Sequence, residues 1–540
     1  MAGRQVSGEM RRDERPKNDF SKGSIVGNIL RLALPMTLAQ LINVLYNIVD
    51  RIFIGMIPEN ATLSLTGLGL CLPIISIVIA FANLFGMGGA PLFSIERGRG
   101  NDAEAEAIMG NSFVLLLITG VILTVAGLAF KRPMLFLFGA SPDTISYAES
   151  YITIYLLGNL FVMVGLGMNS FINAQGFGTT GMMTVLLGAI TNIVLDPIFI
   201  FVFHMGVQGA ALATILSQLL SALWIVRFLT GKRTILRLRR AAFKLERERV
   251  LRIAGLGMSG FTMSITNSSV QIMYNAMLQK AGGDLYVGIM TVINSVREVI
   301  SMPVSGLTNS AQPVMGYNYG AGEYKRTRQA IVFISVVCIT YTVLIWLCVH
   351  SFPEFFIRIF DHSGDLVEKG IPAMRIYFFG FFMMSLQFAG QSVFVGLGRS
   401  RKAVFFSIFR KVVIVIPLIL ILPTVFHLGT DGILMAEPVS NFIGGAACFG
   451  TMMLTVWPEL KRGGRELGKI FRRYRGKAYE KVQGTGDRRS AGSVGICLYD
   501  RLCQGVGVRG GHGGISEIRH LLFRRLGDQF LEQREQKHGR

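Results

Sequence analysis

The chain of 540 residues is too apolar for a water-soluble protein, since 51% of its side chains are hydrophobic, only 16% are charged and the mean hydropathy is +0.48. Soluble domains carry roughly a quarter charged residues, so this composition excludes a soluble enzyme, a disulfide scaffold and a disordered chain. The net charge of +21 is spread over several connecting segments rather than one patch, so we expect a lipid bilayer and no nucleic acid as the partner.

The elements in chain order begin with a polar, basic segment, residues 1–24. It lacks an apolar stretch followed by a small-residue cleavage site, so we expect no signal peptide to be removed there. Twelve apolar stretches follow, each long enough for a transmembrane helix of about 20 residues. The expected spans are 28–56, 63–94, 107–130, 148–174, 180–203, 207–230, 250–277, 285–316, 327–351, 367–396, 403–426 and 431–457.

The Lys and Arg residues predict the orientation of these spans. They gather before the first span, between the sixth and seventh, and after the twelfth, and basic loops stay in the cytoplasm. We therefore expect a multi-pass protein of the cell (cytoplasmic) membrane with both termini cytoplasmic. The basic linker, residues 231–249, fits an amphipathic interfacial helix and a solvated loop equally well. The Gly-rich, basic residues 458–540 predict a mostly disordered cytoplasmic tail.

An internal repeat relates the two halves of the chain. Ala90-Pro91 followed by Gly98-Arg99-Gly100 recurs as Gln312-Pro313 followed by Gly320-Ala321-Gly322, and His204-Met205-Gly206 recurs as His427-Leu428-Gly429. Each half has an even number of spans, so both enter the membrane in the same direction. The fold class is therefore an all-α membrane protein of twelve transmembrane helices in two six-helix bundles, related by a pseudo-two-fold axis along the membrane normal. The N-lobe is residues 25–230 and the C-lobe residues 250–457.

Ionisable residues inside spans are costly and therefore candidates for function. Asp50, Asp196 and Thr214 all lie about seven residues from the outer ends of their spans, or about 10 Å deep. Asn192 lies one helical turn before Asp196, on the same face. Two carboxylates, an amide oxygen and a hydroxyl suit a hard monovalent cation such as Na⁺, or a shared proton. The alternative is that both acids bond to backbone near kinks, with Asp196 capping a distortion before Pro197.

The C-lobe does not repeat this acidic set. The ionisable residues in its spans are Arg297, Glu298, Arg410, Lys411 and Glu437. We expect Glu298 and Arg410 to pair across helices in a structural role. Lys411 can reach the membrane surface with its long side chain.

Abundant methionine and phenylalanine predict an adaptable apolar cavity, since such side chains repack around varied ligands. We expect Tyr46, Gln175, Phe381 and Met384 to line it. The sequence has no P-loop, GxSxG or HExxH motif, so we expect no catalysis. Its six cysteines have no metal-binding spacing, so we expect no cofactor.

Several motifs occur in the order typical of one transporter family. They are LALPMTLAQLINVLYNIVDRIFIG at 32–55, AQGFG at 174–178, NIVLDPIFI at 192–200, GVQGAALAT at 206–214 and QPVMGYNYGAG at 312–322. The chain resembles the multidrug and toxic compound extrusion (MATE) family, of the bacterial type. The resemblance implies a two-lobe antiporter that expels organic cations in exchange for Na⁺ or H⁺. It also implies that Asp50, Asn192, Asp196 and Thr214 match the N-lobe cation-site motif. The acidic C-lobe site of some members is not clearly reproduced.

Two functions fit these observations. The first is a monomeric, secondary active antiporter that exports drugs or dyes, mostly cationic or amphipathic, in exchange for Na⁺ or H⁺ by alternating access. The second is a related flippase or exporter of lipid-linked saccharides. It would require a cationic central cavity for phosphates, whereas most Lys and Arg lie in predicted loops.

Overall fold

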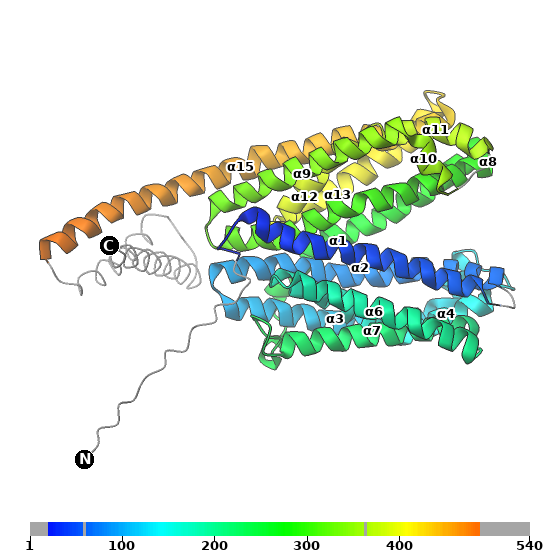
Figure 1. Cartoon of the computed structure of the whole chain (residues 1–540), viewed down its shortest axis with the longest axis horizontal. Helices are drawn as coiled ribbons and strands as arrows, with labels where there is room; N and C mark the ends of the chain where they lie inside the picture. The colour runs from blue at the N-terminus through cyan, green and yellow to red at the C-terminus, as the bar shows by residue number, and fades with distance from the viewer. Residues whose placement is uncertain (1–19, 58–60, 361–363, 486–540) are drawn as a thin grey trace, which may run out of the picture.

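A computed structural model describes residues 20–57, 61–360 and 364–485, and within these ranges the chain forms helices and no strands. Figure 1 shows two bundles side by side, one coloured blue to green (α1–α7) and the other green to orange. The first bundle, the N-lobe, contains α1 (Ile25–Gly55), α2 (Ala61–Arg99), α3 (Asp102–Leu137), α4 (Ile145–Leu157), α5 (Asn159–Ala174), α6 (Gly178–Pro197), its π-helical continuation η1 (Ile198–Val202), and α7 (Gly206–Thr230).

The second bundle, the C-lobe, follows a linker that contains one 3₁₀ turn, η2 (Arg240–Phe243). Its elements are α8 (Arg247–Gly320), α9 (Tyr324–Ser351), α10 (Pro353–Arg358), α11 (Gly364–Phe378), α12 (Phe381–Gly396), α13 (Ser400–Ile408), the π-helical η3 (Phe409–Val415), α14 (Ile416–Thr424) and α15 (Gly429–Thr485).

The predicted twelve-helix, two-bundle architecture is confirmed. In the described residues, nine helical segments are long and apolar enough to span a membrane. The pairs α4–α5 and α11–α12, bent by 57° and 41°, each form a further span. The long helix α8 supplies two spans, because its backbone breaks at Gly283 with φ of 70° and ψ of −165°. A glycine tolerates this positive φ without a Cβ clash.

The backbone repeats along with the sequence. Among the described non-glycine residues, only His204 and His427 have a positive φ, 52° and 54°, which is uncommon for residues with a Cβ. The positive-φ glycines recur at the corresponding places: Gly100 with Gly322, Gly176 with Gly398, and Gly206 with Gly429. The turns that end the matching spans therefore have the same local geometry in both lobes.

The lobes meet in direct backbone contact near the linker, at what we call the linker end of the molecule. A Cβ on Gly98 of α2 would lie 2.0 Å from the carbonyl oxygen of Tyr317, and one on Gly320 of α8 would lie 2.1 Å from that of Ile95. Each contact is the repeat-related counterpart of the other. Nearby, a Cβ on Gly257 would lie 1.7 Å from the carbonyl oxygen of Leu84. Only glycine permits such an approach of two helices, so the lobes are tightly closed here.

The linker differs from both predicted forms. It has a single 3₁₀ turn rather than an amphipathic helix, and Thr234, Leu236 and Leu238 are buried, so it is not simply a solvated loop. The fully buried Gln175 at the end of α5 anchors it. Its Oε1 accepts hydrogen bonds from Thr234 Oγ1 at 2.8 Å and from the backbone nitrogens of Ile235 and Leu236, both at 2.9 Å.

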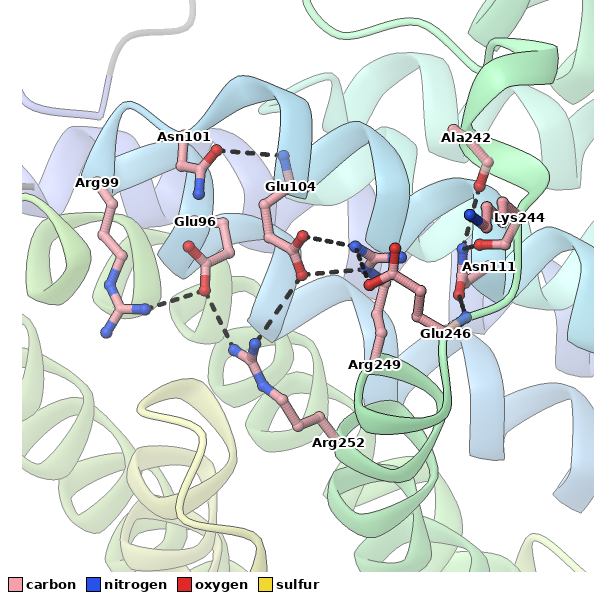
Figure 2. Close-up of polar contacts among 10 residues, drawn as sticks. All are labelled: Glu96, Arg99, Asn101, Glu104, Asn111, Ala242, Lys244, Glu246, Arg249 and Arg252. Atoms are coloured by element: carbon pink, nitrogen blue, oxygen red, sulfur yellow. Dashed lines mark hydrogen bonds and ion pairs between the residues drawn. The ribbon is translucent and has the colours of Figure 1, made fainter. Parts of the chain in front are cut away.

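Asn111 of α3 holds the second half of the linker (Figure 2). Its buried Nδ2 donates to the carbonyl oxygens of Ala242 at 3.1 Å and Lys244 at 2.9 Å, and its Oδ1 accepts from the backbone nitrogen of Glu246 at 3.3 Å. All three of these hydrogen bonds are therefore made to the backbone of the linker. The linker is attached to the N-lobe along its length.

Ion pairs join the two lobes at the same end (Figure 2). Arg249 of α8 donates from Nε and Nη2 to the two oxygens of Glu104 of α3, at 3.0 and 2.7 Å, and this carboxylate raises the pKa of Arg249. Arg252, also of α8, pairs with Glu96 of α2 at 3.1 Å. We call these the interlobe ion pairs. A two-point guanidinium–carboxylate contact is among the stronger polar contacts in proteins.

Helix α15 continues to Thr485, beyond the membrane-spanning stretch, as Figure 1 shows. Residues 458–485 are therefore helical rather than disordered as expected. Twelve of these 28 residues are Lys, Arg or Glu, which have high helix propensity. The prediction of disorder gave too little weight to this propensity. Residues 486–540 of that predicted tail, like residues 1–19, lie outside the described residues.

Candidate functional site

The two predicted carboxylates lie together in the N-lobe. Asp50 of α1 and Asp196 of α6 lie close enough to interact electrostatically, and their exposed fractions are 8% and 0%. Helix α1 packs along α6, so residues far apart in the sequence meet at one depth. Neither carboxylate accepts a hydrogen bond from a backbone N–H in the described chain, so capping of the distortion at Pro197 does not explain Asp196.

The buried oxygens around this pair have few donors. Asn192 donates from Nδ2 to Asp196 Oδ1 at 3.1 Å. Within the described residues, Asp50 Oδ1, Asp196 Oδ2 and Asn192 Oδ1 are buried and have no hydrogen-bond partner. Leaving buried oxygens unsatisfied is costly. Their arrangement fits a bound hard cation, which prefers oxygen ligands, or a proton shared by the two acids.

Thr214 of α7 lies next to the Tyr151 side chain, which is itself close to Asp50. Sequence reasoning missed Tyr151 and Tyr155 of α4. Both are buried, and their rings stack with centroids 6.4 Å apart. The signal that could have found them is their spacing of four residues, which places two polar aromatic tips on one face of an apolar helix. The site therefore has a hydroxyl-bearing wall as well as carboxylates.

A cavity of about 660 Å³ lies between the lobes, on the far side of the glycine contacts from the linker. Its wall is mostly amide, methionine and serine side chains. The residues that line it are Met36, Ala39, Gln40, Asn43, Val44, Asn169, Asn173, Gly181, Met182, Val185, Met263, Asn267, Gln271, Asn294, Arg297, Glu298, Ser301, Met302, Ser305, Met384, Phe388 and Arg410. This volume is in the range of small-molecule pockets.

The four residues predicted to line the cavity have different locations. Met384 is part of the wall. Tyr46 lies one turn before Asp50 on α1, close to the carboxylates and outside the wall. Phe381 is buried in the C-lobe core. Gln175 is a correction: it anchors the linker, because its carbonyl oxygen satisfies three donors of that segment.

The C-lobe charges also pair differently from the prediction. Arg410 Nη1 donates to Glu437 Oε1 at 3.1 Å and to Asn441 Oδ1 at 2.5 Å, so the expected pair with Glu298 is wrong. Lys411 does not reach the membrane surface. It is buried and its Nζ lies 3.2 Å from Glu437 Oε1. The π-helical η3 carries both cations toward one carboxylate on α15.

These features define a class of protein: an α-helical membrane protein with two repeat-related lobes around a central cavity, and a buried acidic cluster in one lobe. The sequence profile of the MatE family matches residues 35–198 and 260–421, one segment in each lobe. The chain therefore belongs to the MatE family, whose members are transporters rather than enzymes.

Similar proteins agree with this assignment. The multidrug export protein MepA of Staphylococcus haemolyticus is 26% identical over 433 residues, which cover 78% of this chain and 93% of that protein. MepA of Staphylococcus saprophyticus is 25% identical over 443 residues, covering 81% and 95%. A solved MATE structure in a bent conformation has a TM-score of 0.78 at 23% identity, covering 83% of this chain and 99% of that one. An outward-facing multidrug resistance MATE transporter gives a TM-score of 0.76 at 24% identity, covering 82% and 98%.

Proposed function

We propose that this chain is a secondary active multidrug antiporter of the cell membrane that exports small organic compounds, mostly cationic or amphipathic, in exchange for Na⁺ or H⁺. The observation that carries this proposal is the buried pair Asp50 and Asp196. Each acid has one oxygen without a hydrogen-bond donor, and Asn192 Oδ1 beside them is a third such oxygen. The names of the MepA relatives, which are multidrug export proteins, support the substrate class.

Helix α1 links the cation cluster to the substrate cavity. It carries Asp50 at the cluster and also Met36, Gln40 and Asn43 in the cavity wall. A cation bound between Asp50 and Asp196 would draw α1 and α6 together, and a bound drug would contact the same helix. Coupling then requires that cation and drug favour opposite conformations, since a ligand shifts an equilibrium only by its differential affinity.

Alternating access follows from the arrangement of the lobes. The glycine contacts and the interlobe ion pairs close the linker end, and the cavity lies beyond them. With the linker and both termini in the cytoplasm, as the basic loops indicate, this is a conformation closed to the cytoplasm. We propose that the monomer takes up drug when the linker end opens and releases it after cation binding.

Breaking an interlobe ion pair should favour opening of the linker end. In Glu104→Gln, Arg249 loses its carboxylate partner on α3 and keeps only Glu246, and the loss of roughly 1 kcal/mol would raise the open population about fivefold. Spin labels at the exposed positions Ala103 and Lys325, in a background without native cysteines, would report the separation of the lobes. Glu354→Gln, which removes an exposed pair within α10, is the matched control. An unchanged distance distribution in Glu104→Gln would contradict the role of this pair.

The function is tested in proteoliposomes that hold purified protein and a fluorescent cationic dye. Sodium and pH gradients are imposed separately, with the membrane potential clamped. We expect dye export to follow one or both gradients and to stop when that gradient is collapsed. Dye movement whose rate is independent of both gradients would reject antiport.

One observation favours the alternative function. The structure places Arg297 and Arg410 in the cavity wall, whereas the sequence predicted most basic residues in loops. Export of lipid-linked saccharides requires such cationic groups for phosphate. Loading the same vesicles with a polyprenyl-linked saccharide, and following its transfer between leaflets, tests this alternative directly.

A further inference from the structure

The charged side chains of the cavity wall all lie on one side of the cavity. Among its lining residues the ionisable ones are Arg297, Glu298 and Arg410, all from the C-lobe. The N-lobe contributes amides, methionines and other neutral side chains, and the acids Asp50 and Asp196 are not part of the wall. A ligand in the cavity therefore meets fixed charge on the C-lobe side only.

Arg297 is the unusual member of this group. It is half-buried on α8, and in the part of the chain that the structure describes it makes no hydrogen bond and no ion pair within 4.0 Å. An arginine inside a membrane protein normally pairs with an acid or with backbone carbonyls. Its guanidinium has five N–H donors available, and the cavity is the space next to it.

Two further donors near Arg297 also lack partners. Arg410 is only 6% exposed, and its buried Nε has no hydrogen-bond partner among the described residues, although Nη1 is bonded. Asn294, one turn before Arg297 on α8, has both amide atoms buried and unpartnered. Three side chains of the wall thus present unused N–H groups.

The neighbouring carboxylates do not neutralise this set. Glu437 is already bonded to Lys411 and Arg410. Glu298 is exposed in the wall and is not paired with either arginine among the described contacts. The cluster has three cations, Arg297, Arg410 and Lys411, and two acids, so it carries one excess formal positive charge. Arg410 and Lys411 are buried. An uncompensated charge in such a place is costly unless a counter-ion binds.

We propose that Arg297, with Arg410 and Asn294, forms a subsite for an anionic group of the transported molecule, a carboxylate or a phosphate. A guanidinium binds either group through two parallel N–H···O contacts. The apolar body of the ligand would rest on Met384 and Phe388, and Glu298 would accept a cationic group. This inference rests on the proposed export function and narrows its substrates to amphipathic molecules that carry an anion, zwitterions included.

The test uses a matched pair of dyes: a zwitterionic rhodamine with a free benzoate, and the methyl ester of the same dye. Their dissociation constants are measured by fluorescence anisotropy on the full chain in lipid nanodiscs. In wild type the free acid should bind more tightly than the ester. In Arg297→Gln the ratio of the free-acid to the ester constant should rise about tenfold, as expected for losing roughly 1.4 kcal/mol of charge-assisted bonding.

Two variants serve as comparisons. Arg297→Lys keeps the charge and should restore part of the preference, and Arg375→Gln removes an exposed cation of α11 outside the cavity and should leave the ratio at its wild-type value. An equal ratio in wild type and Arg297→Gln would overturn the subsite, even if both dyes are exported. Wild type that binds neither dye would overturn the subsite and the proposed function together.

A competition arm identifies the source of the anion. A short-chain polyprenyl phosphate that displaces the free-acid dye from wild type, but not from Arg297→Gln, would assign the subsite to a lipid phosphate. Displacement by benzoate-bearing drugs alone would assign it to a drug carboxylate. Displacement that is the same in both proteins would contradict an anion subsite at Arg297.

Discussion

Asp196→Asn is expected to abolish drug export while the protein still inserts and folds. Asparagine has nearly the same shape, so the packing of α6 against α1 is kept, and the bond from Asn192 can still reach the side-chain oxygen. The change removes the negative charge that would hold Na⁺ and the group that would exchange H⁺. We expect resistance in an efflux-deficient host to fall at least about tenfold, to the level of the empty host, with Asp50→Asn giving the same result.

The measurement is the inhibitory concentration of a cationic drug, normalised to the amount of protein in the membrane. Asp365→Asn, on the exposed first turn of α11, is the control and should retain wild-type resistance. Full resistance from both Asp50→Asn and Asp196→Asn would rule out the carboxylate pair as the coupling site.

The second large effect is expected from Gly257→Ala. The added methyl carbon would lie 1.7 Å from the carbonyl oxygen of Leu84, which belongs to the backbone of the other lobe and cannot rotate away. Overpacking of this kind costs about 1–3 kcal/mol, and here the lobes can relieve it by separating. We expect the linker end to stay open and export to fall at least about tenfold.

Two glycines on the same helix provide matched controls. Gly255 and Gly260 have no heavy atom within 4 Å of the Cβ position, so their replacement by alanine brings the same gain in helix propensity without the clash. Spin-label distances between Ala103 and Lys325, together with dye export, separate the two cases. Similar behaviour of Gly257→Ala and Gly255→Ala would show that close approach of the lobes is not needed.

The helix count and the repeat could be predicted because they depend on local properties. Apolar stretches and the Gly and Pro residues between them are visible in the sequence, and the same positive-φ turns end the matching spans, as at His204 and His427. The meeting of Asp50 and Asp196 was also predictable, since depth along a straight span follows from the rise per residue.

Contacts between helices were less predictable because the rotation of each helix about its axis is not visible in the sequence. The pairing of Arg410 and Lys411 with Glu437 depends on the π-helical η3, which shifts both side chains relative to a regular α-helix. The sequence predicted Gln175 in the cavity wall. The fold of the linker instead directs one hydroxyl and two backbone N–H donors to its side-chain oxygen.

The two lobes are alike in backbone and unequal in charge. Glu437 follows the repeated turn at His427 as Thr214 follows the one at His204, so it occupies the C-lobe counterpart of a proposed cation-site position. There the carboxylate is neutralised by Lys411 and Arg410. The C-lobe therefore already contains its cations, and we expect the coupling cation to bind in the N-lobe.

Competition between cation and dye on the purified chain tests this coupling most directly. Dye affinity is measured in nanodiscs while Na⁺ and pH are varied independently, for wild type and for the double variant Asp50→Asn with Asp196→Asn. We expect one of the two cations to weaken dye binding in wild type, and dye affinity in the double variant to be independent of both. A double variant whose dye affinity still responds to the cation as wild type does would contradict the assignment of the coupling site to these two carboxylates.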